Sequence, residues 1–119
     1  MLVLAAGMFG VFGAMLVSDP EWLDRWLEIK AGTEGRTELR AFYGGMEIGL
    51  AVFLLACASK PAWRGVGALA LALLCGGTAA GRIYGFFADH SFTWKLASFL
   101  AIELLFVVLA VASRRGDGA

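Results

Sequence analysis

The stretch LRAFYGGMEIGLAVFLLACA, residues 39–58, is long and apolar enough to lie within a lipid bilayer, yet it contains Glu47 near its middle and Arg40 close to its start. A charged side chain at the centre of a membrane helix costs roughly 2.5 to 3.5 kcal/mol on insertion scales. A span that keeps such a residue usually has a partner or a use for it. The position of Glu47 is therefore the main question that this sequence raises.

The composition places the chain among membrane proteins. Of its 119 residues, 60% are hydrophobic and 17% are charged, and the formal net charge is zero. A helix needs about 20 apolar residues to cross about 30 Å of hydrocarbon. The apolar residues form four blocks of about that length, at residues 1–17, 39–58, 65–88 and 92–113. The sequence predicts an all-α fold, a four-transmembrane-helix bundle that forms a single membrane domain over residues 1–119.

The first apolar block is the shortest and stands where a secretory signal would stand. It has no basic start and ends in Ser18-Asp19-Pro20 rather than in a small-residue cleavage site. We expect it to be a retained helix.

A polar stretch, residues 18–38, separates the first two blocks. Asp19 can cap a helix with Pro20 at its first position. Within the following segment the apolar side chains fall on one face, namely Trp22, Leu23, Trp26 and Leu27. This pattern predicts a short interfacial amphipathic helix at about residues 20–30, followed by a turn over residues 30–38 that contains two glycines. The helix would be either a simple anchor or a lid over a cavity.

The basic residues of the short connections predict the orientation. Lys60 and Arg64, between the second and third blocks, fall on the same side as Arg114 and Arg115. By the positive-inside rule that side is cytoplasmic, so the N- and C-termini are predicted to be cytoplasmic. The acidic first loop and the Asp89-His90-Ser91 turn then lie outside.

Four charged residues fall in the outer half of the predicted bundle: Arg40, Glu47, Arg82 and Glu103. At 100° per residue, two polar stripes emerge. One contains Arg40, Tyr43, Gly44 and Glu47, and the other contains Thr78, Arg82, Gly85 and Asp89. Small-residue surfaces run beside them, at Gly45 and Gly49 and at Gly77, Gly81 and Gly85, and such surfaces allow close helix approach. Close approach would bring Arg82 to either Glu47 or Glu103.

These charges have a structural and a functional interpretation. The structural one is a buried salt bridge network that fixes helix register. Buried ion pairs stabilise poorly compared with packed apolar residues, and intramembrane ionisable residues are commonly functional. We therefore favour a ligand-binding cavity lined by Arg40, Tyr43, Glu47, Thr78, Arg82 and Glu103.

Other kinds of site receive no support from the sequence. Cys57 and Cys75 lie inside apolar blocks and are interpreted as core residues. His90 is the only histidine, which leaves no cluster for a metal and no bis-histidine haem. Phosphate-binding loops, catalytic triad spacings and basic nucleic-acid stripes are absent from the sequence. We predict no catalytic residue, no metal, no cofactor and no nucleic-acid partner.

The residues Leu39 to Gly45, together with Gly81-Arg82, resemble the small bacterial four-helix membrane proteins that are classed as a family of unknown function. The resemblance covers nearly the whole chain, from Asp19-Pro20 to Glu103. It implies a multi-pass bundle in the bacterial inner membrane and brings no established activity or ligand. More distantly, the architecture is similar to DoxX-type and EXPERA-type bundles. The EXPERA group includes sterol isomerases and lipid binders with intramembrane carboxylates, but its catalytic motif has no match here.

The preferred function is the binding or carriage of a small lipid-like or amphipathic molecule. One alternative is a proton-coupled small transporter that acts as an oligomer, and another is an accessory subunit of a larger membrane complex. An enzyme is least supported, because two carboxylates without placed geometry are weak evidence for acid/base catalysis. The predicted partners are membrane lipids, an amphipathic ligand, and either further copies of the chain or a larger membrane complex.

The predicted orientation is testable by thiol labelling in a background without Cys57 and Cys75. In intact cells, Thr33→Cys in the first loop should react with a membrane-impermeant thiol reagent, whereas Ala62→Cys should react only after the membrane is opened. Labelling of Ala62→Cys alone in intact cells would invert the orientation.

Overall fold

The structure is a computed structural model that describes residues 1–117. These residues are helical apart from short connections, which confirms the all-α prediction for this part of the chain. They form two compact units, residues 2–59 and residues 60–117, which are described separately. The elements are α1 (Leu2–Ser18), α2 (Trp22–Leu27), α3 (Thr33–Leu39), the π-helix η1 (Arg40–Gly45), α4 (Met46–Ser59), the 3₁₀-helix η2 (Pro61–Trp63), α5 (Arg64–Ala88) and α6 (Trp94–Asp117).

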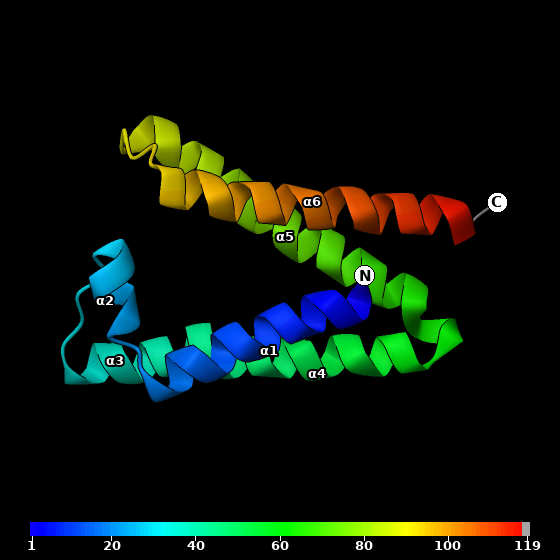
Figure 1. Cartoon of the computed structure of the whole chain (residues 1–119), viewed down its shortest axis with the longest axis horizontal. Coiled ribbons are helices and arrows are strands. Elements are labelled where there is room, and N and C mark those ends of the chain that lie inside the picture. The colour runs from blue at the N-terminus through cyan, green and yellow to red at the C-terminus, as the bar shows by residue number, and fades with distance from the viewer. Residues whose placement is uncertain (118–119) are drawn as a thin grey trace. The chain divides into compact units, whose positions relative to one another are not determined.

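The first unit consists of α1 packed along a second, longer helix. The elements α3, η1 and α4 follow one another without interruption over Thr33–Ser59. Figure 1 shows α1 lying antiparallel to α4. The prediction of a turn over residues 30–38 is wrong from Thr33 onward, because helix α3 begins at that residue.

Two glycines allow α1 and the longer helix to approach closely. A Cβ atom on Gly13 would lie 2.7 Å from the carbonyl oxygen of Gly44 and 3.0 Å from the amide nitrogen of Ile48. A Cβ atom on Gly44 would lie 2.9 Å from the amide nitrogen of Val17. These distances leave no room for a side chain, so backbone packs against backbone at this crossing.

The glycine surfaces expected from the sequence are not the ones in contact. Nothing in the described chain lies within 4 Å of a Cβ built on Gly49, Gly77 or Gly81. On Gly45, the nearest atom would be a carbonyl oxygen of its own helix, that of Arg40, at 3.7 Å. The contact glycine of this helix is Gly44, one position away from the predicted pair of Gly45 and Gly49 and therefore on a different side of the helix.

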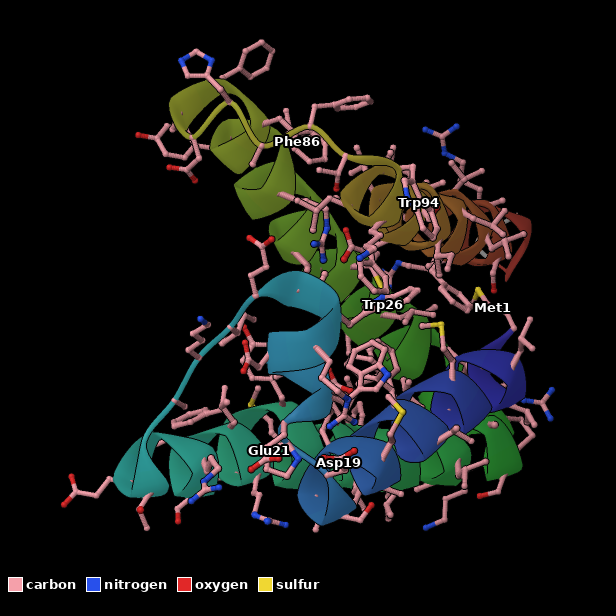
Figure 2. All side chains as sticks on the ribbon, turned by 60° about the vertical axis from the view of Figure 1, so that its left-hand side comes forward. Met1, Asp19, Glu21, Trp26, Phe86 and Trp94 are labelled. Carbon is pink, nitrogen blue, oxygen red and sulfur yellow. The ribbon has the colours of Figure 1, made fainter. Side chains whose placement is uncertain are left out.

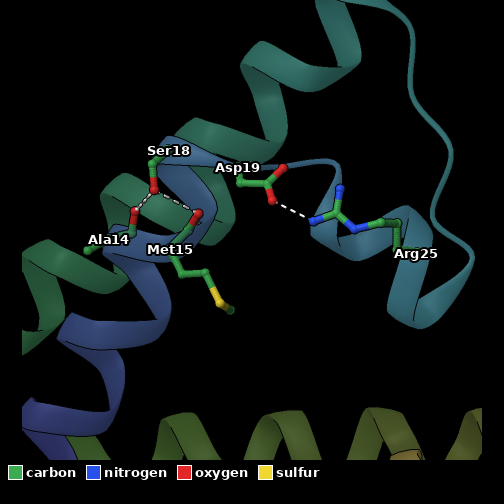
Figure 3. Close-up of polar contacts among 5 residues, drawn as sticks. All are labelled: Ala14, Met15, Ser18, Asp19 and Arg25. Carbon is green, nitrogen blue, oxygen red and sulfur yellow. Dashed lines mark hydrogen bonds and ion pairs between the residues drawn. The ribbon is translucent and has the colours of Figure 1, made fainter.

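The C-terminal end of α1 has several partners for its last carbonyl groups (Figure 3). The hydroxyl of Ser18 donates to the carbonyl oxygens of Ala14, at 2.8 Å, and Met15, at 3.1 Å. The guanidinium of Arg40 donates to the carbonyl oxygen of Val17. The last carbonyls of a helix have no partner within the helix, so the Arg40 contact replaces water at Val17, whereas the Met15 carbonyl also accepts from the Asp19 amide at 2.8 Å.

Helix α2 attaches to α1 through aromatic packing. The ring of Phe12 meets the ring of Trp22 edge-on, with 5.6 Å between centroids, and Trp22 stacks on Trp26 at 5.8 Å. The side chain of Leu23 is fully buried. The helix is shorter than the predicted range of 20–30, because Glu28 adopts a left-handed conformation with φ of 61° and ends it.

The expected cap of this helix is also absent. Asp19 does not cap α2. The N-cap residue of α2 is Glu21, whose side chain makes no capping hydrogen bond. The carboxylate of Asp19 instead accepts a hydrogen bond from Arg25 at 2.5 Å (Figure 3).

The second unit is a helical hairpin of α5 and α6, joined by a short turn (Figure 1). The buried residues of α5 recur every three or four positions, as expected for one helix face: Ala68, Leu71, Cys75 and Ala79. The matching face of α6 carries the buried Phe106 and Ala110. Small residues dominate this seam, which suits close helix packing.

Within residues 1–117, three helices are long and apolar enough to cross a membrane: Thr33–Ser59, Pro61–Ala88 and Trp94–Gly116. Leu2–Ser18 is a shorter apolar helix. Figure 2 shows the side chains that surround the helices. Many large apolar side chains are exposed, including Val11, 72% exposed, and Leu73, 67% exposed. Such extensive apolar exposure is unusual for a soluble protein and compatible with a multi-pass membrane protein.

The close approach at Gly44 predicts that Gly44→Ala destabilises the first unit. Overpacking typically costs about 1–3 kcal/mol. The matched control is Gly49→Ala on the same helix, where nothing is within 4 Å and where a better helix former should be neutral or slightly stabilising. Thermal unfolding in detergent measures both. Equal effects of the two substitutions would show that the crossing does not depend on Gly44.

Candidate functional site

An ion pair links the two helices of the second unit. Arg82 on α5 donates from Nε to Oε2 of Glu103 on α6 at 3.1 Å and from Nη2 to Oε1 at 2.5 Å. This two-point geometry is the strong form of an arginine–carboxylate contact. The ring of Phe99 lies 5.4 Å from the guanidinium carbon, so Arg82 also has an aromatic neighbour at cation–π distance.

The helix faces explain why these residues meet. Arg82 follows Ala79 by three positions and so continues the buried stripe of α5. Glu103 precedes Phe106 by three positions and continues the buried stripe of α6. Of the two partners that the sequence left open for Arg82, the structure pairs it with Glu103.

The pair is largely covered rather than fully buried. The side chains of Arg82 and Glu103 are 21% and 14% exposed. No charged residue with a described side chain belongs to the fully buried class. The structure therefore does not support the expected buried salt bridge, because this pair is only part-buried.

Glu47 stands in the first turn of α4. Its side chain is half-buried, and its Oε2 atom is buried without a hydrogen-bond partner among the described residues. A buried acceptor without a partner costs about 1–3 kcal/mol, and more when it is charged. Glu47 is in the first unit and Arg82 in the second, so their pairing stays a prediction.

Immediately before Glu47, the backbone departs from the α-helix. The π-helix η1 spans Arg40–Gly45, whose sequence RAFYGG is the motif that carried the family resemblance. Single π-helical turns within α-helices are frequent at functional sites. Arg40 is bound to the end of α1, and Tyr43 is 43% exposed. Sequence reasoning missed η1 because the motif has no local signal for a π-helix.

Thr78, the remaining predicted site residue, makes a local contact only. Its hydroxyl donates to the carbonyl oxygen of Leu74, one turn earlier in α5, at 2.8 Å. The structure thus brings together Arg82 with Glu103, and Arg40 with the end of α1. A cavity shared by all six predicted residues stays a prediction.

A small pocket of about 90 Å³ lies in the first unit and contains none of the six predicted site residues. Two of its lining residues, Arg36 and Glu21, form an ion pair at 2.7 Å. Nearby, the hydrogen bond and the charge of Asp19 raise the pKa of the exposed Arg25 guanidinium. The pocket is lined by Pro20, Glu21, Asp24, Ile29, Ala31, Arg36 and Leu39.

The described part of the chain contains neither a cluster of metal ligands nor a disulfide bond. Within residues 1–117 no group of three or more His, Cys, Asp or Glu residues is placed to hold a metal ion. Cys57 and Cys75 are both buried and free.

Comparison with known proteins gives one match. The family described as "Domain of unknown function (DUF4345)" matches residues 1–113. The expected kinship with a family of unknown function is confirmed over these residues. No curated protein and no solved structure matches the chain.

The Arg82–Glu103 contact is testable by a double-mutant cycle. Glu103→Gln or Arg82→Gln alone should destabilise the protein by about 1–3 kcal/mol, because each leaves a covered charge without its partner. The double variant should recover part of that loss, since interacting residues couple by about 0.5–3 kcal/mol. Unfolding in detergent measures the four free energies.

The matched control for this cycle is the exposed pair Asp19 and Arg25, for which a much smaller coupling is expected because solvent screens it. Additive losses at Arg82 and Glu103 would show that their contact contributes nothing to stability.

Proposed function

The chain belongs to the DUF4345 family, whose description names no activity, and from that premise we propose that it is a membrane protein that binds a small amphipathic molecule at Glu47. The proposed arrangement is a bundle of four spans in the bacterial inner membrane, forming one domain, with α2 at the interface and both termini cytoplasmic. Its three long apolar helices and the shorter α1 support this arrangement.

The observation that carries the proposal is the unpartnered Oε2 atom of Glu47. Four other polar side chains of the long helices have partners: Arg40, Thr78, Arg82 and Glu103. Among the described residues, Oε2 of Glu47 is the buried side-chain oxygen without a hydrogen-bond partner, and a carboxylate kept in an apolar span without a donor is costly. A ligand that brings a donor to this oxygen would remove the cost.

The chemistry of this oxygen restricts the ligand class. An ionised carboxylate only accepts hydrogen bonds, so the polar end of the ligand carries a hydroxyl, amide or ammonium group. The flanking helix surface is apolar and exposed at Met46, 62% exposed, and at Val52, 62% exposed. The remainder of the ligand would therefore be hydrocarbon.

A binding role for Glu47 predicts two effects of opposite sign. Glu47→Gln removes an unsatisfied charge, so the ligand-free protein should become more stable. The same change should weaken retention of the ligand about 10- to 100-fold, the loss expected when a charged hydrogen-bond acceptor becomes neutral. Thermal unfolding of delipidated protein measures the first effect, and mass spectrometry of molecules that co-purify in mild detergent measures the second.

Glu38→Gln is the matched control, because Glu38 is an exposed glutamate on α3 of the same continuous helix. It should change neither readout. A purely structural Glu47 would give the reverse result, with lower stability in Glu47→Gln and unchanged co-purifying molecules. Co-purification of bulk membrane lipids alone with the wild-type chain would also contradict the proposal.

A second candidate is an accessory subunit of a larger membrane complex. Within the α5–α6 unit nothing approaches Gly77 or Gly81 within 4 Å. An open small-residue face of this kind is suited to docking another helix. Under this alternative, Gly81→Leu would leave the stability of the isolated chain unchanged and release a partner that co-purifies with the wild type.

A further inference from the structure

One end of the α5–α6 unit gathers positive charge. Lys60 and Arg64 stand where α5 begins, and Arg114 and Arg115 stand near the end of α6. All four residues are exposed. Neither residues 60–68 nor residues 104–116 contain an aspartate or a glutamate, and Asp117 is the nearest acidic residue in the sequence. This end of the hairpin therefore carries an excess of cations.

Two of these cations are held in place. Arg114 donates from Nη1 to the carbonyl oxygen of Gly65 at 2.7 Å, and this bond joins the last turns of α6 to the first turn of α5. The ammonium of Lys60 lies 4.0 Å from the ring centroid of Trp63. Arg114 and Lys60 are thus positioned by the fold, whereas free surface lysines and arginines would sample many positions.

The beginning of α5 is an unfavourable place for cations. The peptide dipoles already contribute positive charge at a helix N-terminus, and like charges repel. Arg114 and Lys60 both stand at the beginning of α5. An anion at this end would offset the repulsion, and a guanidinium that uses one of its five N–H groups on Gly65 keeps others for that anion.

The neighbouring surface indicates what kind of anion would fit. Trp63 is 45% exposed, and tryptophan favours the level of lipid headgroups. One turn further into α5, Val66 is 55% and Leu69 is 43% exposed. A cationic end bordered first by an indole ring and then by apolar side chains matches the order of headgroup, interface and acyl chain in a phospholipid.

We propose that this end of the hairpin, defined by Lys60, Trp63 and Arg114, binds the phosphodiester group of an anionic phospholipid. Basic sites between membrane helices are suited to such headgroups. The site is separate from Glu47 in chemistry and in sequence, so it does not rest on the proposed function.

The test is thermal unfolding of the delipidated full-length chain in a neutral detergent with added lipid. Phosphatidylglycerol should raise the unfolding temperature, whereas phosphatidylcholine at the same concentration should not. The double change Lys60→Gln with Arg114→Gln should weaken the apparent affinity for phosphatidylglycerol roughly 30-fold, given the contribution of each basic residue near an anionic lipid. High salt should weaken the same effect, because exposed charges are screened.

Three controls decide the outcome. Lys30→Gln, at an exposed lysine between α2 and α3, should keep the full response to phosphatidylglycerol. Lys60→Arg with Arg114→Lys keeps both charges and should retain most of it, which separates loss of binding from loss of folding. Inorganic phosphate replaces the lipid in the third arm and should give no comparable stabilisation.

Equal stabilisation by the two lipids, or an unchanged response in the neutral double variant, would overturn the proposal. A response to inorganic phosphate as large as that to phosphatidylglycerol would replace the lipid with a free anion. If the charge-retaining and the neutral variant both unfold at the same temperature, well below that of the wild type and without any lipid, Lys60 and Arg114 would be needed for folding and not for lipid binding.

Discussion

Polar groups inside apolar helices must find partners within the protein, and this constraint organises the whole chain. Helices satisfy their own backbone groups, which is why they can cross hydrocarbon, but polar side chains and helix ends need other solutions. Arg82 donates to the carboxylate of Glu103, and Arg40 donates to a carbonyl oxygen at the end of α1. Thr78 donates to a carbonyl oxygen of its own helix. The first two of these contacts also join neighbouring helices within each unit. Oε2 of Glu47 is buried and has no hydrogen-bond partner within the described chain. The functional hypothesis therefore centres on Glu47.

The sequence predicted the long helices well, because an apolar block marks α1, α4, α5 and α6. It failed where structure depends on something other than hydropathy. Residues 33–39 are polar and contain Gly35, which favoured a turn, yet they form α3 as a continuation of the helix that follows. The π-helix at Arg40–Gly45 has no signature in composition.

The candidate site was predictable in part for a similar reason. The residue types were evident from their cost in a membrane, but the pairing needed the faces of the helices. The spacing of Ala79 to Arg82 and of Glu103 to Phe106 places both charges on the packed seam, and this spacing could have selected Glu103 in advance. Gly13 has no distinguishing signal, because it lies in an uncharged apolar block that also contains Gly7 and Gly10. No pattern in the sequence distinguishes a glycine that touches a neighbouring backbone from one that faces lipid.

The end of α1 has a consequence for the depth at which this helix can lie. Its 17 residues measure about 25 Å, some 5 Å less than the typical hydrocarbon thickness. A helix of that length normally requires a thinner bilayer or hydrated ends. Here the guanidinium of Arg40 donates to the carbonyl oxygen of Val17, one of the last carbonyls of α1. Arg40 thereby takes the place of one water molecule at this end of the helix and lowers the number of carbonyl groups that need hydration there.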